Sequence, residues 1–444
     1  MATQTTPQTT QLNLLDELYL HLDRREEPWV VHVEARVDGR IDAERLARAL
    51  ALAVERHPIA RARLGTWRYF DVAYSWDIIE RLSEVPFRIA DCTDEADVDE
   101  ARERHFAFSP PLDVAPPFAV LLAHAPAGDA IMLNVNHAAV DGIGAARLML
   151  SILRAYAEAD DPVPAFDPLE VRDVLALAGS QSAAERYQRT RALVRLAAHQ
   201  GTATRVARAG GTDRPGYGFE FISLSADETT ELRDRRTPGT TVNDVLLGAL
   251  AVTVARWNEM HGQEVGRIAL TMPVNLRPEE WRREVVSNFA SYTTISLDTD
   301  DRSDLAHAVA AAARRTAVIK RERLAGVVVD VLKRLSVLSV AVKRRLPDLI
   351  PLTGDMVVDT ASVSNLGVVE SPPTLDDTAG SVKAMWFSQP GRMPLGTCIG
   401  ALTLNGRLHV VLRYRHAQFD HASAHEFFRL FRDVLMEEEA DPTT

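Results

Sequence analysis

The segment NVNHAAVDG, residues 134–142, places a histidine and an aspartate four positions apart, at His137 and Asp141. The residues before it, AIMLNVN, have the pattern of a strand, so His137 stands at a strand end and Gly142 permits a tight turn into a helix. An imidazole with a pKa of ~6.5 accepts a proton near neutral pH, which makes His137 a candidate general base. On spacing alone, a histidine satisfied in a loop with Asp141 as a helix N-cap is favoured, because this spacing is common.

Other motifs with a known mechanism are missing from the sequence. It has no G-x-S-x-G elbow, no Walker loop and no H-E-x-x-H. Gly142 and Gly144 follow a strand as in a dinucleotide-binding turn, but the third glycine is absent, so we reject a cofactor site.

Metal and disulfide chemistry are also not expected. The 2 cysteines, Cys92 and Cys398, exclude a disulfide scaffold and a cysteine-based zinc or iron–sulfur site. The histidines His416, His421 and His425 have no obvious acidic partner, and we interpret them as surface residues rather than as a metal cluster.

Net charge argues against one class of partner, and the chain start and the cysteine count predict a cytoplasmic protein. The 50 Lys and Arg residues against 62 Asp and Glu residues give a net charge of −12, which argues against non-specific nucleic-acid binding because phosphates repel a net anion. The first residues, MATQTTPQTTQ, lack the basic and apolar regions of a secretion signal, and no stretch has the ~20 apolar residues of a membrane span. Sparse cysteine usage suits a reducing compartment.

One segment departs from the acidic average. Residues 320–345 interleave Lys and Arg with Val and Leu, which predicts a basic amphipathic helix that could lie on a membrane or dock an acidic carrier protein. A solvated helix face is the favoured alternative, because runs of charge usually lie on the surface.

Strand-like and helix-like segments alternate along the chain, which predicts an α/β or α+β layered fold. In the first half we expect a strand over Trp29–Val37, a helix capped by Asp42, and helices over residues 98–108 and 143–157. In the second half we expect a helix from near Thr241, a last helix from near Asp420, and strands over residues 218–224, 267–274, 291–297, 357–365 and the hairpin 401–416.

The texture of the chain changes in its middle. Proline-containing loops flank an Arg- and Ala-rich helical stretch, residues 181–208, and Gly-Gly and Pro-Gly pairs follow it. We predict an N-terminal lobe over residues 1–180 that carries NHAAVDG, a helical linker or crossover over 181–216, and a C-terminal lobe over 217–444.

Several segments resemble, in order, the motifs of the chloramphenicol acetyltransferase-like (HxxxD acyltransferase) superfamily. This superfamily includes nonribosomal peptide condensation domains and wax ester synthase/diacylglycerol acyltransferases. NVNHAAVDG resembles its H-H-x-x-x-D-G motif, and the further matches are ERHPIARARL, FSPPLDVAPPFAVLLA, TVNDVLLGAL, TMPVNLRP and VSNLG. The resemblance covers nearly the whole chain and implies two similar lobes, each a mixed sheet packed with helices, with an active-site tunnel between them.

The resemblance also implies roles for individual residues. His137 matches the catalytic histidine, which deprotonates an acceptor hydroxyl or amine for attack on a thioester. Asp141 matches an aspartate that fixes the motif loop by pairing with an arginine, here Arg277, and Gly142 matches the turn glycine. The first histidine of the pair is replaced by Asn136, which we expect to pack or hydrogen-bond, because strand neighbours point to opposite faces.

Four further residues match positions near the substrate. Asn243 and Asp244 match an Asn-Asp pair, although Asn243 could instead cap its helix. Ser364 and Asn365 match a segment that could line the channel, or could form a strand-ending turn. An Asp-Phe-Gly-Trp-Gly motif is missing, which argues against the plant branch and leaves the oxyanion donors unassigned.

The resemblance implies a free-standing acyltransferase or condensation enzyme of natural-product (secondary or antibiotic) metabolism. An acyl group would pass from a coenzyme A or carrier-protein phosphopantetheine thioester to an alcohol or amine, giving an ester or amide. No resident cofactor or metal is expected, and we expect a monomer. One alternative is a wax ester or triacylglycerol synthase.

The other alternative is a non-catalytic module that binds a carrier protein or acyl chain, which the Asn136 replacement motivates. The enzyme and the binding module are distinguished by the surroundings of the His137 side chain. Catalysis requires His137 to face an open tunnel reached from both sides, whereas a buried His137 argues against catalysis.

Overall fold

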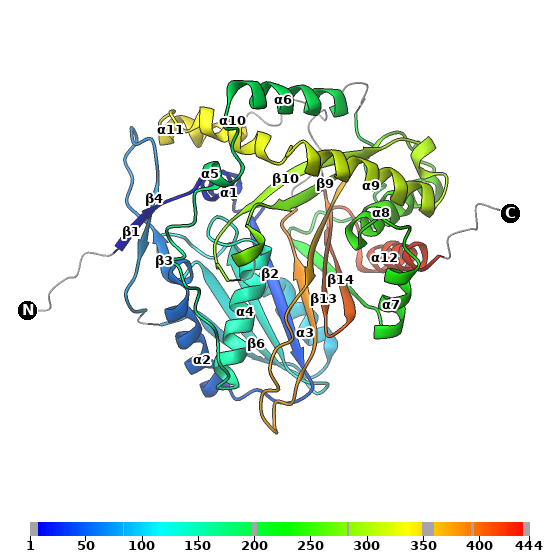
Figure 1. Cartoon of the computed structure of the whole chain (residues 1–444). Helices are drawn as coiled ribbons and strands as arrows, with labels where there is room; N and C mark the ends of the chain where they lie inside the picture. The colour runs from blue at the N-terminus through cyan, green and yellow to red at the C-terminus, as the bar shows by residue number, and fades with distance from the viewer. Residues whose placement is uncertain are drawn as a thin grey trace, which may run out of the picture.

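The structure is a computed structural model that describes residues 8–82, 84–197, 202–281, 284–348, 359–391 and 395–437. Two large mixed sheets stand side by side, each packed with helices (Figure 1). This arrangement confirms the predicted two-lobed α/β class.

The first sheet has five strands in the order β12-β2-β7-β6-β5. Their bounds are β2 Val30–Val37, β5 Phe87–Asp91, β6 Phe118–His124, β7 Ala130–Asn136 and β12 Val382–Ser388. Side chains of β7 alternate between two cores: Ile131, Leu133 and Val135 share one with residues of α2 (Ala43–Arg56) and α4 (Gly142–Tyr156), while Met132 packs with residues of α3 (Glu95–Phe106). Burial on both faces explains why this strand is nearly continuously apolar.

The second sheet has six strands in the order β10-β9-β11-β13-β14-β8. Their bounds are β8 Tyr217–Ser223, β9 Ile268–Asn275, β10 Ala290–Leu297, β11 Ala361–Val368, β13 Thr397–Leu404 and β14 Arg407–Arg415. One face packs on the helices α8 Val242–Met260, α9 Leu305–Arg321 and α12 His421–Met436, with Val363, Ile399 and Leu412 in that core. The neighbouring residues in register, Ser362, Cys398 and Arg413, lie on the opposite face.

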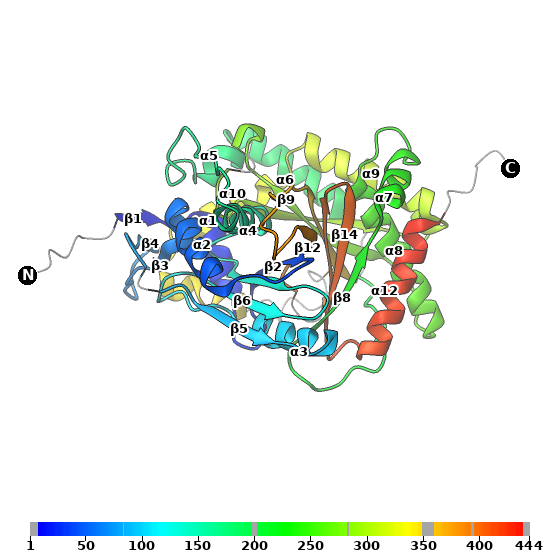
Figure 2. The ribbon, with the colours of Figure 1, turned by 90° about the horizontal axis from the view of Figure 1, so that it is seen from below.

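Strand β12 joins the two halves. It lies between β11 and β13 in the chain, yet it pairs antiparallel with β2 of the first sheet (Figure 2). No strand is predicted here from the sequence. The second half of the chain therefore supplies an edge strand to the sheet that carries His137.

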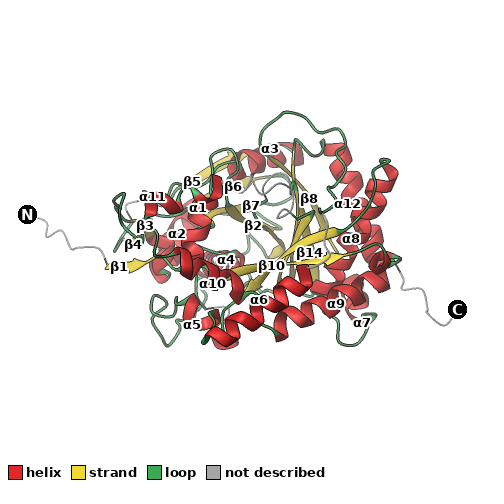
Figure 3. Cartoon of the chain, turned by 90° about the horizontal axis from the view of Figure 1, so that it is seen from above, coloured by secondary structure: helices red, strands yellow, loops and turns green. Residues whose placement is uncertain are grey.

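A third, small sheet lies at the edge of the first lobe. It consists of β1 Gln8–Gln11, β4 Ser75–Ile78 and β3 Ala62–Leu64. Near it lie α1 Leu14–Leu22, α5 Val174–Ala178, α10 Gly326–Leu335 and α11 Val340–Lys343 (Figure 3). The remaining helices are α6 Ala183–Ala197 and α7 Ala226–Asp234.

Several local predictions are confirmed. Asp42 caps α2 and Asp420 caps α12, each with a side-chain bond to a helix N–H group. Asn405 and Gly406 have φ of 50° and 76°, as a type I′ turn requires. None of the described helices is both long and apolar enough to cross a bilayer.

The expectation of one long basic helix over residues 320–345 is wrong. The segment is the end of α9, then α10, then α11. Arg323 interrupts the helix with a φ of 51°, a left-handed conformation that a continuous helix does not allow. The helix expected over 181–208 is also too long, since residues 202–208 are not helical; residues 198–201 lie outside the described residues.

Candidate active site

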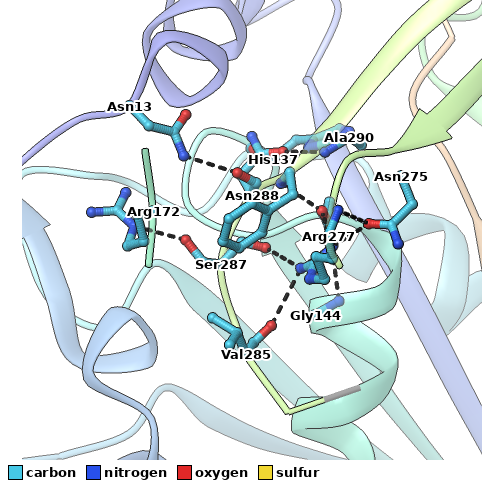
Figure 4. Close-up of polar contacts among 12 residues, drawn as sticks. Asn13, His137, Gly144, Arg172, Asn275, Arg277, Val285, Ser287, Asn288 and Ala290 are labelled. Carbon is cyan, nitrogen blue, oxygen red and sulfur yellow. Dashed lines mark hydrogen bonds and ion pairs between the residues drawn. The ribbon is translucent and has the colours of Figure 1, made fainter. Parts of the chain in front are cut away.

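The backbone of the loop that carries His137 is held by hydrogen bonds from both halves of the chain. It connects β7 to α4, and the backbone N–H of His137 donates to the carbonyl oxygen of Trp29 over 3.0 Å. The carbonyl of His137 accepts from Nδ2 of Asn288 over 2.9 Å (Figure 4). The histidine backbone is therefore fixed before any substrate binds.

The predicted ion pair between Asp141 and Arg277 is present and bidentate. Nη1 and Nη2 of Arg277 donate to Oδ2 and Oδ1 of Asp141 over 2.7 and 2.8 Å, and both side chains are fully buried. Asp141 also accepts from the N–H of Gly144, which makes it the N-cap of α4, and from the N–H of Phe289. The pair joins the start of α4 to the end of β9, and so locks the motif loop to the second lobe.

The charges of this pair are stabilised by their surroundings. Burial opposes ionisation of Asp141, but Arg277 and the donated N–H bonds hold the pKa of this carboxyl below its usual value. Arg277 also donates to the carbonyl of Ser287 over 2.9 Å, and its guanidinium lies 4.5 Å from the ring centre of Phe289. Figure 4 shows Arg277 between the start of α4 at Gly144 and the segment from Val285 to Ser287.

The ring of His137 is enclosed, which contradicts the expected open tunnel. Tyr19 of α1 stacks on it with ring centroids 4.2 Å apart, and only 8% of the residue is exposed. Burial lowers the pKa of His137 to about 4 against the opposing effect of Asp141, so the imidazole is neutral at physiological pH.

The ring nitrogens of His137 are not used by the fold. Apart from its own backbone, no described residue bonds them, and Nδ1 is buried without a hydrogen-bond partner. Three other buried histidines each bond another residue through the ring: His32 bonds the Ser388 hydroxyl, His57 the Ser151 hydroxyl and His105 the Met132 carbonyl. His32 also has one nitrogen, Nε2, without a partner, so His137 differs in that its ring bonds no other described residue. A buried polar group without a partner in a fixed loop is a candidate for chemistry rather than for packing.

Asn136 occupies a hydrogen-bonding site next to this loop. Its Nδ2 donates to Ser109 Oγ over 2.8 Å and to the Pro110 carbonyl over 3.1 Å, and its Oδ1 accepts from the N–H of Ala138. It also bonds Asp23. The side chain braces the β7 end against the residues that follow α3.

Gly142 is needed for space rather than for a turn conformation. It is the first residue of α4, and its φ is not positive. A Cβ atom at this position would lie 2.6 Å from the ring of Phe387 and 2.9 Å from Leu366. The expected role as a turn residue is therefore replaced by close packing of α4 against β12 and β11.

The Asn243–Asp244 pair lies at the start of α8, and its bonds are within the second half. Thr241, not Asn243, caps this helix, and Asp244 completes a capping box with it. Asp244 also accepts from Thr316, and Asn243 donates to the sulfur of Met272. The cap that sequence reasoning allowed for Asn243 is thus two residues earlier.

Ser364 and Asn365 lie within β11, so they do not form a turn after it. Ser364 is buried opposite Gly400 on β13, and Asn365 accepts from the N–H of Gly367. Just beyond them, Leu366 and Val368 line a small cavity with Ile143 of α4. These residues border the contact between the two lobes, and none of their described bonds reaches His137.

Sequence reasoning missed the segment before β10 and the helix α1. The side chain of Asn288 donates to the His137 carbonyl, and the Ser287 carbonyl accepts a hydrogen bond from Arg277. Asn13, the N-cap of α1, donates to the Asn288 carbonyl over 2.9 Å. Ser287 also receives Nε of Arg172 over 2.8 Å. Neither Ser287 nor Asn288 lies in a segment that matches a motif of the superfamily.

Of the three C-terminal histidines interpreted as surface residues, His421 and His425 are exposed as expected and His416 is not. His416 is buried beside Glu103, whereas His421 and His425 are exposed and share Glu220 as an acidic partner at 3.1 Å. No group of three or more potential metal ligands occurs in the described ranges.

Comparison with known proteins agrees with this geometry. The condensation domain family matches residues 18–326. Two uncharacterized proteins of Mycobacterium tuberculosis, from strains CDC 1551 and H37Rv, are 38% identical over 434 residues, covering 97% of this chain and 99% of theirs.

Solved structures share the fold at low identity. The first condensation domain of the calcium-dependent antibiotic synthetase, bound to a substrate analogue, superposes with a TM-score of 0.72 at 16% identity and covers 99% of this chain and 98% of its own. The trichothecene 15-O-acetyltransferase of Fusarium sporotrichioides gives 0.69 at 12% identity, with 98% and 97% covered. With the family match over most of its length, the chain belongs to the condensation domain family.

Proposed function

We propose that the chain is an acyltransferase of natural-product metabolism that moves an acyl group from a thioester to an alcohol or amine. The thioester is carried by coenzyme A or by the phosphopantetheine arm of a carrier protein. One observation carries the proposal: His137 is a buried histidine whose ring bonds no other described residue, in a loop that both lobes hold in place. Family membership agrees with this reaction class.

In the proposed reaction, the neutral imidazole of His137 accepts the acceptor's O–H or N–H proton as the oxygen or nitrogen attacks the thioester carbonyl. The tetrahedral intermediate then expels the thiolate, which takes the proton from the imidazolium. The C–S bond breaks and an ester or amide bond forms, so no oxidant or metal is consumed. Asp141 acts as a positioning residue, because its oxygens are engaged by Arg277, Gly144 and Phe289.

The enclosed ring sets a condition on this reaction. Tyr19 stacks on one face of the His137 ring and only 8% of the residue is exposed, so we infer that movement of α1 or of the Tyr19 side chain widens substrate access. Because a buried His137 argues against catalysis, this conformation is not the reactive one. The proposal therefore includes an open state that the substrate selects.

The same burial favours a second candidate, a condensation-like module that binds a carrier protein or an acyl chain without turnover. The Asn136 replacement is the other observation on its side. In that case His137 would keep its place through packing under Tyr19 alone.

A screen of thioester donors against alcohol and amine acceptors, read by intact mass, separates the two candidates. With an accepted pair, His137→Ala should slow transfer about 100-fold or more, the usual size of a general-base contribution. His105→Gln is the matched control, since it changes a buried histidine whose ring is already bonded, and it should keep the rate. Equal rates for wild type and His137→Ala with all donors would reject catalysis, and carrier binding without transfer would support the module.

A further inference from the structure

Large hydrophobic side chains gather at one edge of the molecule, where they remain exposed. Phe70 is 85% exposed and Tyr69 68%, in the loop between β3 and β4, and Val337 after α10 is 74% exposed. Val72 of the same loop and Val342 of α11 are also exposed. Single exposed apolar residues are ordinary, but a cluster marks an interaction surface.

The loop and the α10–α11 segment form one continuous surface. The N–H of Val340 donates to the Asp71 carbonyl over 2.7 Å, and Nζ of Lys343 donates to the Val72 carbonyl over 2.8 Å. The Arg344 guanidinium lies 4.9 Å from the ring centre of Trp67. Figures 1 and 3 both place α11 at the same edge as β3 and β4. We call residues 67–72 together with 331–345 the aromatic-basic patch.

The patch is positively charged in an otherwise acidic chain. Its exposed cations are Arg68, Lys333, Arg334, Arg344 and Arg345. The acidic groups beside them are few: Asp71 within the loop accepts from the Arg68 N–H, and Asp348 lies between Arg24 and Arg345. A local cationic surface on a chain of net charge −12 attracts an anionic partner at this edge.

An apolar cavity adjoins the patch. Its volume is about 200 Å³, and it lies between α1 and the α10–α11 segment. Leucines dominate its lining, among them Leu14, Leu18, Leu332, Leu335 and Leu346. The cavity offers a place for a hydrocarbon segment directly behind the cationic surface.

We propose that the aromatic-basic patch binds the surface of an anionic lipid bilayer. Two adjacent aromatic rings with basic side chains around them are the composition of an interfacial anchor, in which the rings enter the headgroup region and the cations meet lipid phosphates. This inference does not depend on the reaction proposed above.

The test uses the full chain and sedimentation with lipid vesicles. Vesicles containing phosphatidylglycerol should bind the protein, vesicles of phosphatidylcholine alone should bind it far less, and added salt should weaken the binding. Tyr69→Ser/Phe70→Ser and Lys333→Glu/Arg334→Glu should each reduce the bound fraction about tenfold or more. These side chains are exposed, so the variants should keep the thermal unfolding midpoint.

Matched controls come from other faces. Tyr187→Ser removes an exposed ring from α6, and Arg429→Glu reverses an exposed charge on α12; both should bind as wild type. The proposal is overturned if wild type does not prefer anionic vesicles, or if the Tyr69/Phe70 variant binds as well as wild type. An acidic carrier protein that binds this patch while vesicles do not would also overturn it, and would assign the surface to a protein partner.

Discussion

The phenol ring of Tyr19 lies flat against the imidazole of His137, with centroids 4.2 Å apart and an angle of 24° between the planes. The Tyr19 hydroxyl donates to the Ala290 carbonyl over 2.7 Å, which fixes the ring between α1 and the start of β10. The candidate base is thus covered by a residue of one half that is held by the other half. This cover contributes to the burial that lowers the pKa of His137.

Tyr19→Ala should uncover the imidazole. Because burial is the main cause that lowers the pKa of His137 to about 4, exposure should raise it toward 6.5. Histidine-selective NMR titration, with the signal assigned through His137→Ala, measures the shift. Tyr19→Phe is the control: it keeps the ring and loses only the bond to Ala290, so the pKa should stay near 4. A Tyr19→Ala value that also stays near 4 would mean that other groups enclose the ring.

Stability should fall as the pH drops from about 6.5 toward 4. Burial lowers the pKa of His57 to about 3 and of His105 and His137 to about 4, so the unfolded chain binds protons that the folded chain refuses. Each group is then expected to contribute a slope of about 1.4 kcal/mol per pH unit. Asp16, whose pKa burial raises to about 6, acts with the opposite sign between about 6 and 3.8.

Urea unfolding at several pH values measures this slope. His57→Gln should lower it by about one proton's worth, ~1.4 kcal/mol per pH unit, between pH ~6 and ~4. Identical slopes for wild type and His57→Gln would show that His57 titrates normally in the folded chain.

Removing one partner of the Asp141–Arg277 pair should be costly. Arg277→Met leaves a buried carboxylate without its cation, which is expected to reduce the free energy of unfolding by about 3–5 kcal/mol. The double variant Asp141→Asn/Arg277→Met should lose less than the sum of the two single variants. Arg314→Met, which changes an exposed arginine near Asp301, should cost under ~1 kcal/mol. Strict additivity in the double variant would mean that the two buried side chains are not coupled.

Arg413 should be replaceable at a gain in stability. Its guanidinium is buried, Nε and Nη2 have no hydrogen-bond partner, and no ion pair to it is found in the described ranges. The cost of burying this charge is partly offset by two contacts. The guanidinium carbon lies 3.8 Å from the ring centre of Tyr217, and Nη1 donates to the carbonyls of Val30 and Gln389. Arg413→Met should therefore raise the free energy of unfolding by about 1 kcal/mol. A loss of similar size, measured by denaturant unfolding, would show that the charge is paired.

Gly142→Ala should be destabilising, by about 1–3 kcal/mol, because its Cβ would overlap the Phe387 ring. The second-site change Phe387→Leu should recover part of this loss. Thermal unfolding of the single and double variants measures the effect, and no recovery in the double variant would place the clash elsewhere.

Helix caps and tight turns could be predicted from the sequence, because they depend on residues that are close together in the chain. Asp42 and Asp420 cap helices through their own side chains, and the Asn405–Gly406 turn depends on positive φ at two adjacent residues. The Asp141–Arg277 pair, 136 positions apart, was predicted only through resemblance, since no periodicity links the two residues. Tyr19 and Asn288 carried no signal, because their importance arises from the packing of α1 and β10 against the loop.

Some features could not be read from the sequence because they depend on tertiary competition. Thr241 rather than Asn243 caps α8, since its side chain and Asp244 satisfy each other's backbone groups. The long basic helix fails at Arg323, where the chain turns so that α10 can pack near α1. The enclosure of His137 depends on the ring of Tyr19, which stands 118 positions earlier in the chain.

The crossing of β12 has a consequence for how the chain can be divided. A fragment that ends before Val382 would leave the β2 edge of the first sheet without its neighbour, with a row of unpaired backbone groups. The first half is therefore not expected to fold as a separate soluble fragment, and unfolding should be cooperative across both halves. The β12–β2 pairing also connects the two halves at one side. Any opening over His137 must therefore be a rotation of the halves about this pairing and not their separation.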